Sequence, residues 1–339
     1  MMRSLRTRLE AVARFPNLLA AAREAERGKR YRRDVLAFNA ALEGRLFELQ
    51  AELLSGRWRP QPHRHFHIRD PKPRWISAAP YKDRVVHHAI CRQIAQPLER
   101  ALIDDCWANR TGKGSHRAVL RLQQFCGRYQ YALKVDIRRY FASIDQQILK
   151  NQLRKRIADP RLLALLCEII DGGVVPEPHQ HQFAGDDLVS HLTRSVGLPI
   201  GNLTSQLWAN TYLGAFDHWV KETLHARGYL RFVDDFVLLH DDPDVVRQWQ
   251  SQLTNKLATL RLLPHPRKTV IQPTSSGVSF LGYVVWPKRI RVRGATVRRF
   301  RRRLRHDSGP TKDQLAAWRG HTALAGGFRR RHFPLRGLS

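Results

Sequence analysis

Residues 229–240 read YLRFVDDFVLLH, and this stretch decides the fold. Two adjacent acidic residues, Asp234 and Asp235, lie between apolar runs of strand-forming residues. One interpretation is a plain β-hairpin, since Asp is common in turns. A second is that the hairpin holds carboxylates against a divalent metal ion, because hard cations take oxygen ligands and rarely bind through one carboxylate. The second interpretation requires a third carboxylate on a neighbouring strand.

Asp136 is the candidate for that third carboxylate. It ends the segment YALKVD at residues 131–136, whose apolar residues predict a buried strand, and the sequence then turns toward a helix at 145–157. A plain turn cap is the alternative for Asp136. Strand, helix and acidic hairpin in this order predict one antiparallel sheet that gathers the three carboxylates. Two Mg²⁺ ions held there would activate a 3′-hydroxyl and stabilise a leaving pyrophosphate.

The charge of the chain indicates its partner. Among 339 residues, 59 are Lys or Arg and 29 are Asp or Glu, so the formal net charge is +30. Nucleic acid is favoured over a membrane surface, because the basic residues occur on nearly every segment and not on one amphipathic helix. The four cysteines lack CxxC spacing, which argues against a zinc ribbon and a disulfide framework. With no apolar run long enough for a bilayer and no secretory signal, we expect a cytoplasmic protein without membrane contact.

Apolar spacings of three and four predict helices, and β-branched runs predict short strands. The expected helices cover 33–54, 83–102 and 244–260, and the expected strands cover 269–272 and 278–286. Ser115 follows a basic, Gly-containing loop and is expected to cap a helix.

The densest basic run, KRIRVRGATVRRFRRRLRH, begins at Lys288. A helix starting near Ala295 would display these arginines to a nucleic acid backbone, and a disordered basic tail is the alternative. Leu315, Trp318 and Leu324 predict at least one further packed helix.

Several segments together carry a family resemblance. In order, LKVDIRRYF, GLPIGNLTSQ, RFVDDF, HPRKT and SFLGY resemble the palm blocks of reverse transcriptases, and PKPRWI and APYKDRVVHHA resemble their fingers blocks. The resemblance covers 72–285 and implies an α+β right-hand polymerase with fingers, a ferredoxin-like palm and a small helical thumb. The form LPIGNLTSQ, with an aliphatic residue before Gly and Gln after Ser, is similar to that of diversity-generating retroelement enzymes.

The resemblance implies a division of the chain. The expected parts are an N-terminal extension and fingers at 1–130, a palm at 131–158 and 197–287, a fingers insertion at 159–196 and a basic helical thumb at 288–339.

By position, the resemblance also implies catalytic roles. Asp136, Asp234 and Asp235 are the expected catalytic carboxylates and metal ligands, assisted by the carbonyl of Ile137. Lys268 falls where a lysine neutralises or protonates the leaving pyrophosphate.

Other matched positions are expected to contact the incoming nucleotide. Lys72 and Arg74 fall where fingers residues grip the triphosphate, and Phe141 falls where an aromatic ring excludes the ribose 2′-hydroxyl. Ile200 takes the place of a Gln that usually lies near the nascent base pair, and Gly201 allows close approach of the backbone. The loss of the polar contact at Ile200 predicts low fidelity.

The implied activity is RNA-directed DNA polymerisation, which makes cDNA on a template RNA from deoxynucleoside triphosphates with two Mg²⁺ ions or with Mn²⁺. The implied setting is mutagenic retrohoming, with errors at template adenines, a bacterial or phage gene and an oligomeric accessory variability protein. The expected nucleic-acid-binding residues of the thumb are Arg298, Arg299, Arg302 and Arg303. A free-standing group II-like or phage-defence reverse transcriptase is one alternative, and a non-catalytic nucleic-acid-binding protein is another.

Overall fold

The computed structural model of the protein describes residues 5–69, 73–187, 189–304 and 310–325. The chain forms two compact units, and each unit is built from three segments. Unit 1 comprises Met1–Ile103, Ile137–Trp219 and Asn255–Leu263, and unit 2 comprises Asp104–Asp136, Val220–Thr254 and Pro264–Ser339. The boundaries of fingers, palm and thumb given above stay predictions.

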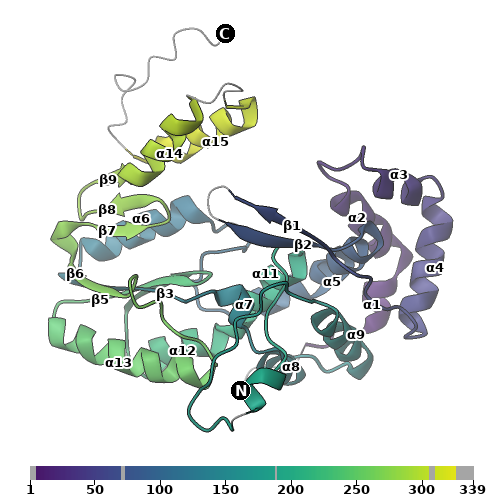
Figure 1. Ribbon diagram of the computed structural model, residues 1–339, viewed down its shortest axis with the longest axis horizontal. Coiled ribbons are helices and arrows are strands. Elements are labelled where there is room, and N and C mark those ends of the chain that lie inside the picture. The colour runs from purple at the N-terminus through teal and green to yellow at the C-terminus, as the bar shows by residue number, and fades with distance from the viewer. Residues whose placement is uncertain (1–4, 70–72, 188, 305–309, 326–339) are drawn as a thin grey trace. The chain divides into compact units, whose positions relative to one another are not determined.

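A four-stranded antiparallel sheet is the centre of unit 2 (Figure 1). Its strands are β3 (Tyr131–Asp136), β4 (Gly228–Phe232), β5 (Asp235–His240) and β6 (Val270–Pro273). Numbered in chain order within the sheet, the strands lie in the order 2-3-1-4. Helices separate the first strand from the second and the third from the fourth, which is the split βαβ arrangement that the sequence predicted.

Both faces of this sheet are covered. On one face, Leu122 and Phe125 of α6 (Ser115–Cys126) join Leu230 of β4 in a buried apolar cluster. A three-stranded sheet belongs to the same cluster and consists of β7 (Val278–Phe280), β8 (Tyr283–Val285) and β9 (Ile290–Val292). On the other face, Trp249 of α13 (Pro243–Thr259) lies edge-on to His240 of β5, with 5.3 Å between ring centroids.

Two helices end the described part of unit 2. They are α14 (Gly294–Leu304) and α15 (Lys312–Ala323), and a capping box at Thr311 begins the second. The rings of Phe300 and Trp318 stack at a centroid distance of 4.1 Å, so each helix covers an aromatic side chain of the other. The predictions of a helix near Ala295 and of a further packed helix are confirmed.

Unit 1 is mainly helical and contains the hairpin of β1 (Arg64–Ile68) and β2 (Arg74–Ala78). Its longest helix is α5 (Tyr81–Arg100), against which α2 and α11 pack (Figure 1). Its other helices are α1 (Leu9–Ala13), α2 (Phe15–Ala25), α3 (Arg33–Asn39), α4 (Leu42–Leu54), α7 (Tyr140–Ser143), α8 (Gln146–Arg154), α9 (Pro160–Asp171), α10 (Ser190–Thr193) and α11 (Leu203–Tyr212). The helix α12 (Gly214–Glu222) continues from unit 1 into unit 2. Across the described ranges, no helix combines the length and the apolar composition that a bilayer requires.

Two local predictions were wrong. The single helix expected over 33–54 is two helices, because α3 ends at Asn39, whose amide donates to Glu26 Oε2 at 2.8 Å and accepts from the Tyr81 hydroxyl at 3.4 Å. These contacts hold Asn39, a residue of low helix propensity, at the point where the helix ends. Ser115 is the first residue of α6 and its side chain makes no capping hydrogen bond, since Gly114 occupies the N-cap position with φ of 124°.

Gly228 in β4 gives a stability prediction. A Cβ atom there would lie 2.7 Å from the Tyr129 ring and 2.8 Å from the carbonyl oxygen of Leu239, so the strands would have to shift. We expect Gly228→Ala to lower the free energy of unfolding of unit 2 by about 2 kcal/mol in urea titrations. Gly320→Ala is the control, because a Cβ on this exposed residue of α15 meets nothing within 4 Å. An equal effect of both substitutions would contradict the expectation.

Candidate active site

The hairpin of β4 and β5 presents the two adjacent aspartates. Phe232 and Asp235 form its last strand pair, which leaves Val233 and Asp234 as a two-residue turn. Val233 has φ of 57°, a left-handed conformation that a β-branched residue rarely adopts and that costs about 1–3 kcal/mol. The fully buried guanidinium of Arg231 donates to the Val233 carbonyl at 2.9 Å and so holds this strained turn.

The third carboxylate lies on the neighbouring strand. In the register of β3 and β5, Asp136 is the direct partner of Asp235. Directly opposed residues of an antiparallel pair point to the same face, with Cβ atoms about 5 Å apart. The expected assembly of Asp136, Asp234 and Asp235 in one place is therefore what the strand pairing produces.

Two lysines accompany these carboxylates. Lys268 Nζ lies 2.7 Å from Asp136 Oδ1, and Lys134 Nζ lies 3.3 Å from Asp235 Oδ2. Lys268 is placed by the turn at 265–268, whose first residue, His265, donates its N–H to the Asp136 carbonyl at 2.7 Å. The sequence predicted a role for Lys268 but missed Lys134, although a lysine inside an otherwise apolar strand is an unusual placement.

The environment of Asp235 disfavours its charged form. Burial is the main cause that raises the pKa of this carboxyl to about 7, and the neighbouring Asp234 and Asp136 carboxylates contribute to the rise against the opposing effect of Lys134. Asp235 Oδ1 is buried and has no hydrogen-bond partner. A divalent cation would provide the missing contact and favour the ionised carboxylate.

The described residues contain no group of three or more His, Cys, Asp or Glu side chains already arranged as a metal site. Asp136 and Asp235 instead contact the two lysines. Clustered carboxylates with one unsatisfied buried oxygen are nevertheless the donor type that Mg²⁺ takes in phosphoryl-transfer enzymes. The donor set therefore fits the expected ions.

The residues expected to contact the nucleotide are in unit 1. Arg74 is exposed at the start of β2, Phe141 is half-buried in α7, and Ile200 and Gly201 precede α11. Ile137 is buried and directly follows Asp136. These roles stay predictions, and Lys72 lies outside the described residues.

The loop that contains Ile200 is attached to β2. Ser77 donates its N–H to the Ile200 carbonyl at 2.9 Å. Gly201 has φ of 120°, and a Cβ there would lie 3.0 Å from the Ile76 side chain. Gly201 thus permits a close approach of β2. The expected close approach of its backbone to a nucleotide stays a prediction.

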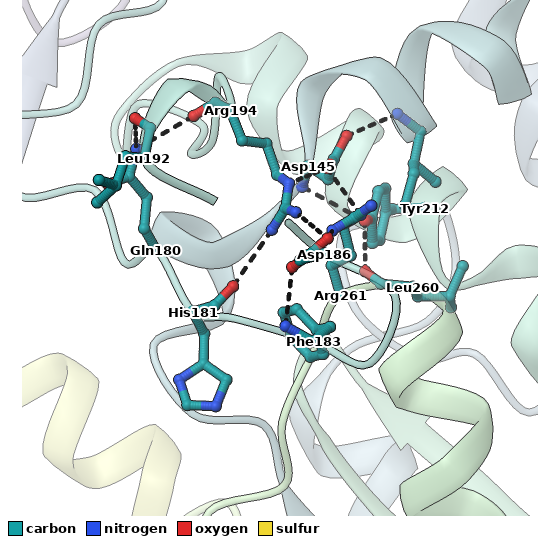
Figure 2. A network of polar contacts seen from close by, with 11 residues as sticks. Asp145, Gln180, His181, Phe183, Asp186, Leu192, Arg194, Tyr212, Leu260 and Arg261 are labelled. Carbon is teal, nitrogen blue, oxygen red and sulfur yellow. Dashed lines mark hydrogen bonds and ion pairs between the residues drawn. The ribbon is translucent and has the colours of Figure 1, made fainter. Parts of the chain in front are cut away.

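A polar network in unit 1 fixes the excursion between α9 and α11 (Figure 2). Asp186 Oδ1 accepts from the guanidiniums of Arg194 and Arg261, each at 2.5 Å. Asp145, the N-cap residue of α8, lies 3.5 Å from Arg194 and 3.4 Å from Arg261. Hydrogen bonds from the two arginines lower the pKa of the Asp186 carboxyl. The segment between α9 and α11 is therefore held by ion pairs to the largely buried Asp186 carboxylate.

The four expected thumb arginines all lie on α14. Arg298 and Arg302 are exposed and lie one turn apart, and Arg299 and Arg303 are half-buried beside them. Phe300, the buried residue of this helix, faces Trp318. This geometry leaves a basic face on α14, and its contact with nucleic acid stays a prediction.

Comparison with known families decides the assignment. The family model described as "Reverse transcriptase (RNA-dependent DNA polymerase)" matches residues 68–285, which is more than half of the chain. The chain belongs to the reverse transcriptase family. This membership, together with the palm-type sheet, confirms the α+β right-hand polymerase fold expected from the sequence.

The curated relatives are distant in sequence. Protein YkfC of Escherichia coli is 26% identical over 283 residues, which are 72% of this chain and 71% of YkfC. Group II intron-encoded protein LtrA of Lactococcus lactis subsp. cremoris is 22% identical over 238 residues, which are 68% of this chain and 38% of LtrA. The chain thus spans well under half the length of LtrA.

Solved telomerase structures are similar in part. Apo telomerase from Candida tropicalis has a TM-score of 0.49 and 13% identity, over 70% of this chain and 49% of that chain. Telomerase from Candida albicans with a TWJ fragment of telomeric RNA has a TM-score of 0.47 and 13% identity, over 70% and 46%. The protein spans about half of each telomerase chain.

Proposed function

We propose that this protein is an RNA-directed DNA polymerase that makes cDNA on a template RNA from deoxynucleoside triphosphates. The observation that supports this most directly is the pairing of Asp136 with Asp235, beside Asp234 in the adjoining turn. Phosphoryl transfer depends mainly on positioning and on neutralising charge at the reacting phosphate, and clustered carboxylates serve that purpose by holding cations. The net charge of +30 suits a nucleic acid substrate.

Under this proposal, Asp136, Asp234, Asp235 and the Ile137 carbonyl would hold two Mg²⁺ ions, or Mn²⁺ in their place. When bound, these ions supply Lewis-acid activation of a 3′-hydroxyl and neutralise charge on the leaving pyrophosphate. The Lys268 side chain is 41% exposed, and its ammonium group forms an ion pair with Asp136 at 2.7 Å. Under this proposal its ammonium group would hold a proton near the leaving group.

A primer-extension assay tests the proposal. With an RNA template, a DNA primer, deoxynucleoside triphosphates and Mg²⁺, we expect the wild type to extend the primer and Asp234→Ala to give only background. Binding of the template–primer hybrid to both proteins is the control for folding. Equal extension by the two proteins would refute the polymerase proposal and leave a non-catalytic nucleic-acid-binding protein.

We further propose that the enzyme is of the diversity-generating type and works with an oligomeric accessory variability protein. The segment GLPIGNLTSQ supports this, because Ile200 replaces the polar side chain expected there. The Ile200 carbonyl accepts a hydrogen bond from the N–H of Ser77 in β2, which fixes the backbone of this loop. The difference from the usual Gln therefore lies in the side chain at position 200. An apolar side chain offers no hydrogen bond with which to control template-base geometry.

Ile200→Gln tests the low-fidelity part. We expect misincorporation opposite template adenines to fall by about 10-fold, which corresponds to one polar contact. Sequencing of cDNA made in vitro gives the error spectrum. Leu203→Gln, at a partly exposed position three residues along, is the matched control and should leave the spectrum unchanged. An unaltered spectrum for Ile200→Gln would sink the idea.

A free-standing group II-like or phage-defence reverse transcriptase is the second candidate. The similarity to the group II intron-encoded protein LtrA favours it. The genome neighbourhood separates the candidates, because a template repeat and a variable repeat beside the gene belong with the diversity-generating type. Their absence would favour the second candidate.

A further inference from the structure

Unit 1 contains a basic pocket that the proposed polymerase activity does not use. Its volume is about 480 Å³. Four arginines line it, Arg32 and Arg33 before and at the start of α3, Arg64 on β1 and Arg84 on α5. Asp34 is the one acidic residue among the described residues that line it, and short apolar side chains of residues 78–80 form another wall.

The cations of this pocket are incompletely neutralised. Arg84 is only 12% exposed, and its guanidinium donates to Asp34 at 3.2 Å, but its Nε is buried and has no hydrogen-bond partner. Arg32, Arg33 and Arg64 are exposed, and within the described ranges no carboxylate forms an ion pair with them. Four guanidiniums against one carboxylate leave an excess of three positive charges.

The same cluster of arginines affects the pKa of a neighbouring lysine. Burial lowers the pKa of Lys29, and the guanidiniums of Arg84 and Arg32 lower it further. A buried donor without a partner has lost its hydrogen bonds to water, and an anionic acceptor in the pocket would replace them. Both observations indicate that the pocket is arranged for an anion.

The size and the charge of the pocket select the class of anion. Its volume is in the range of sites for small molecules, about 300–1,000 Å³, and the pocket is too small to hold an extended strand of nucleic acid. Guanidinium groups bind phosphate oxygens through paired hydrogen bonds. An excess of three charges in one small space matches a group that concentrates several negative charges, whereas the phosphates of a nucleic acid backbone carry one charge each.

We propose that this pocket binds a triphosphate group, carried by a free nucleotide or by the 5′ end of an RNA chain. None of the described candidates for the deoxynucleotide site, Arg74, Phe141, Ile200 and Gly201, lines the pocket. The site is therefore additional to the one that feeds the polymerase. Its binding does not depend on catalysis and can be measured on a protein that makes no DNA.

Calorimetric titration of the full chain with inorganic tripolyphosphate tests the proposal. EDTA is present throughout, so that binding through divalent cations at the aspartates is suppressed. We expect Arg64→Gln to weaken binding by about 10-fold, the worth of one charged hydrogen bond. Arg154→Gln is the matched control, because it removes the same charge from an exposed position of unit 1 on α8. Equal affinity of wild type, Arg64→Gln and Arg154→Gln would overturn the proposal.

A second variant and two RNAs complete the test. Arg33→Gln should weaken binding as Arg64→Gln does, and circular dichroism checks that both variants are folded. Tighter binding of an RNA with a 5′-triphosphate than of the same RNA with a 5′-hydroxyl, lost in Arg64→Gln, would identify an RNA end as the source. Equal binding of the two RNAs, with tripolyphosphate binding still dependent on Arg64, would identify a free nucleotide.

Discussion

Asp136→Asn is expected to lower the rate of deoxynucleotide addition by at least about 1000-fold, which corresponds to about 4 kcal/mol in the barrier. Asparagine has the same shape and its side-chain oxygen can still accept from Lys268, whose Nζ lies 2.7 Å from Asp136 Oδ1. The substitution removes one negative charge directly opposite Asp235. It therefore weakens the holding of divalent cations while it leaves the strand pairing in place.

Single-turnover primer extension measures this effect. Asp244→Asn is the matched control, since it makes the same chemical change at an exposed residue of α13 whose partner is the neighbouring Arg247. We expect the control to retain the wild-type rate and Asp136→Asn to bind the template–primer hybrid as the wild type does. A loss below about 10-fold for Asp136→Asn would remove Asp136 from the catalytic set.

The palm and its carboxylates were predictable because their signals are local. Strand-forming runs around 131–136 and 229–240 have the length and composition of short strands, and each places its acidic residues at a strand end. Strand pairing then brings the acidic residues together, because the end of one antiparallel strand lies beside the start of its neighbour. The family resemblance rests on the same segments, so the two lines of argument agree here.

The features that the sequence did not reveal depend on contacts between distant residues. Asp186 and Arg261 are separated by 75 positions, and nothing in the sequence around Asp186 indicates this partner. Lys134 of β3 pairs with Asp235 of the adjacent strand β5, and this contact follows only from the register of the two strands.

The break after Asn39 depends on Tyr81 in another helix, because apolar spacing alone continues through it.

Strain at Val233 is a further feature that residue patterns hide. Val is a strong strand former, and its propensity predicts an extended conformation. The structure instead places it at φ of 57°, where the turn must close between Phe232 and Asp235. Tertiary contacts, among them the hydrogen bond from buried Arg231 to the Val233 carbonyl, hold a conformation that local preference opposes.

The surroundings of Phe141 make sugar selection testable. The Tyr140 hydroxyl donates to the Ala209 carbonyl at 2.5 Å, and Leu198 donates its N–H to the Phe141 carbonyl at 2.7 Å. The rings of Phe141 and Tyr140 lie edge to face, with 5.7 Å between centroids. The backbone of α7 is therefore fixed on both sides, and shortening the half-buried Phe141 side chain removes the ring without releasing the helix.

Phe141→Ala is expected to raise the incorporation of ribonucleotides relative to deoxynucleotides by about 100-fold, because the space of the ring becomes available to a 2′-hydroxyl. The measurement compares kcat/KM for a ribonucleoside triphosphate and its deoxy counterpart on one RNA template. Phe141→Tyr is the control: it keeps the ring, so its selectivity should stay within about 3-fold of the wild type. Because the 2′-hydroxyl is the only difference between the two substrates, a gain confined to the ribonucleotide would assign the steric gate to Phe141. Unchanged selectivity in Phe141→Ala would assign sugar discrimination to another residue while leaving the carboxylate assignment intact.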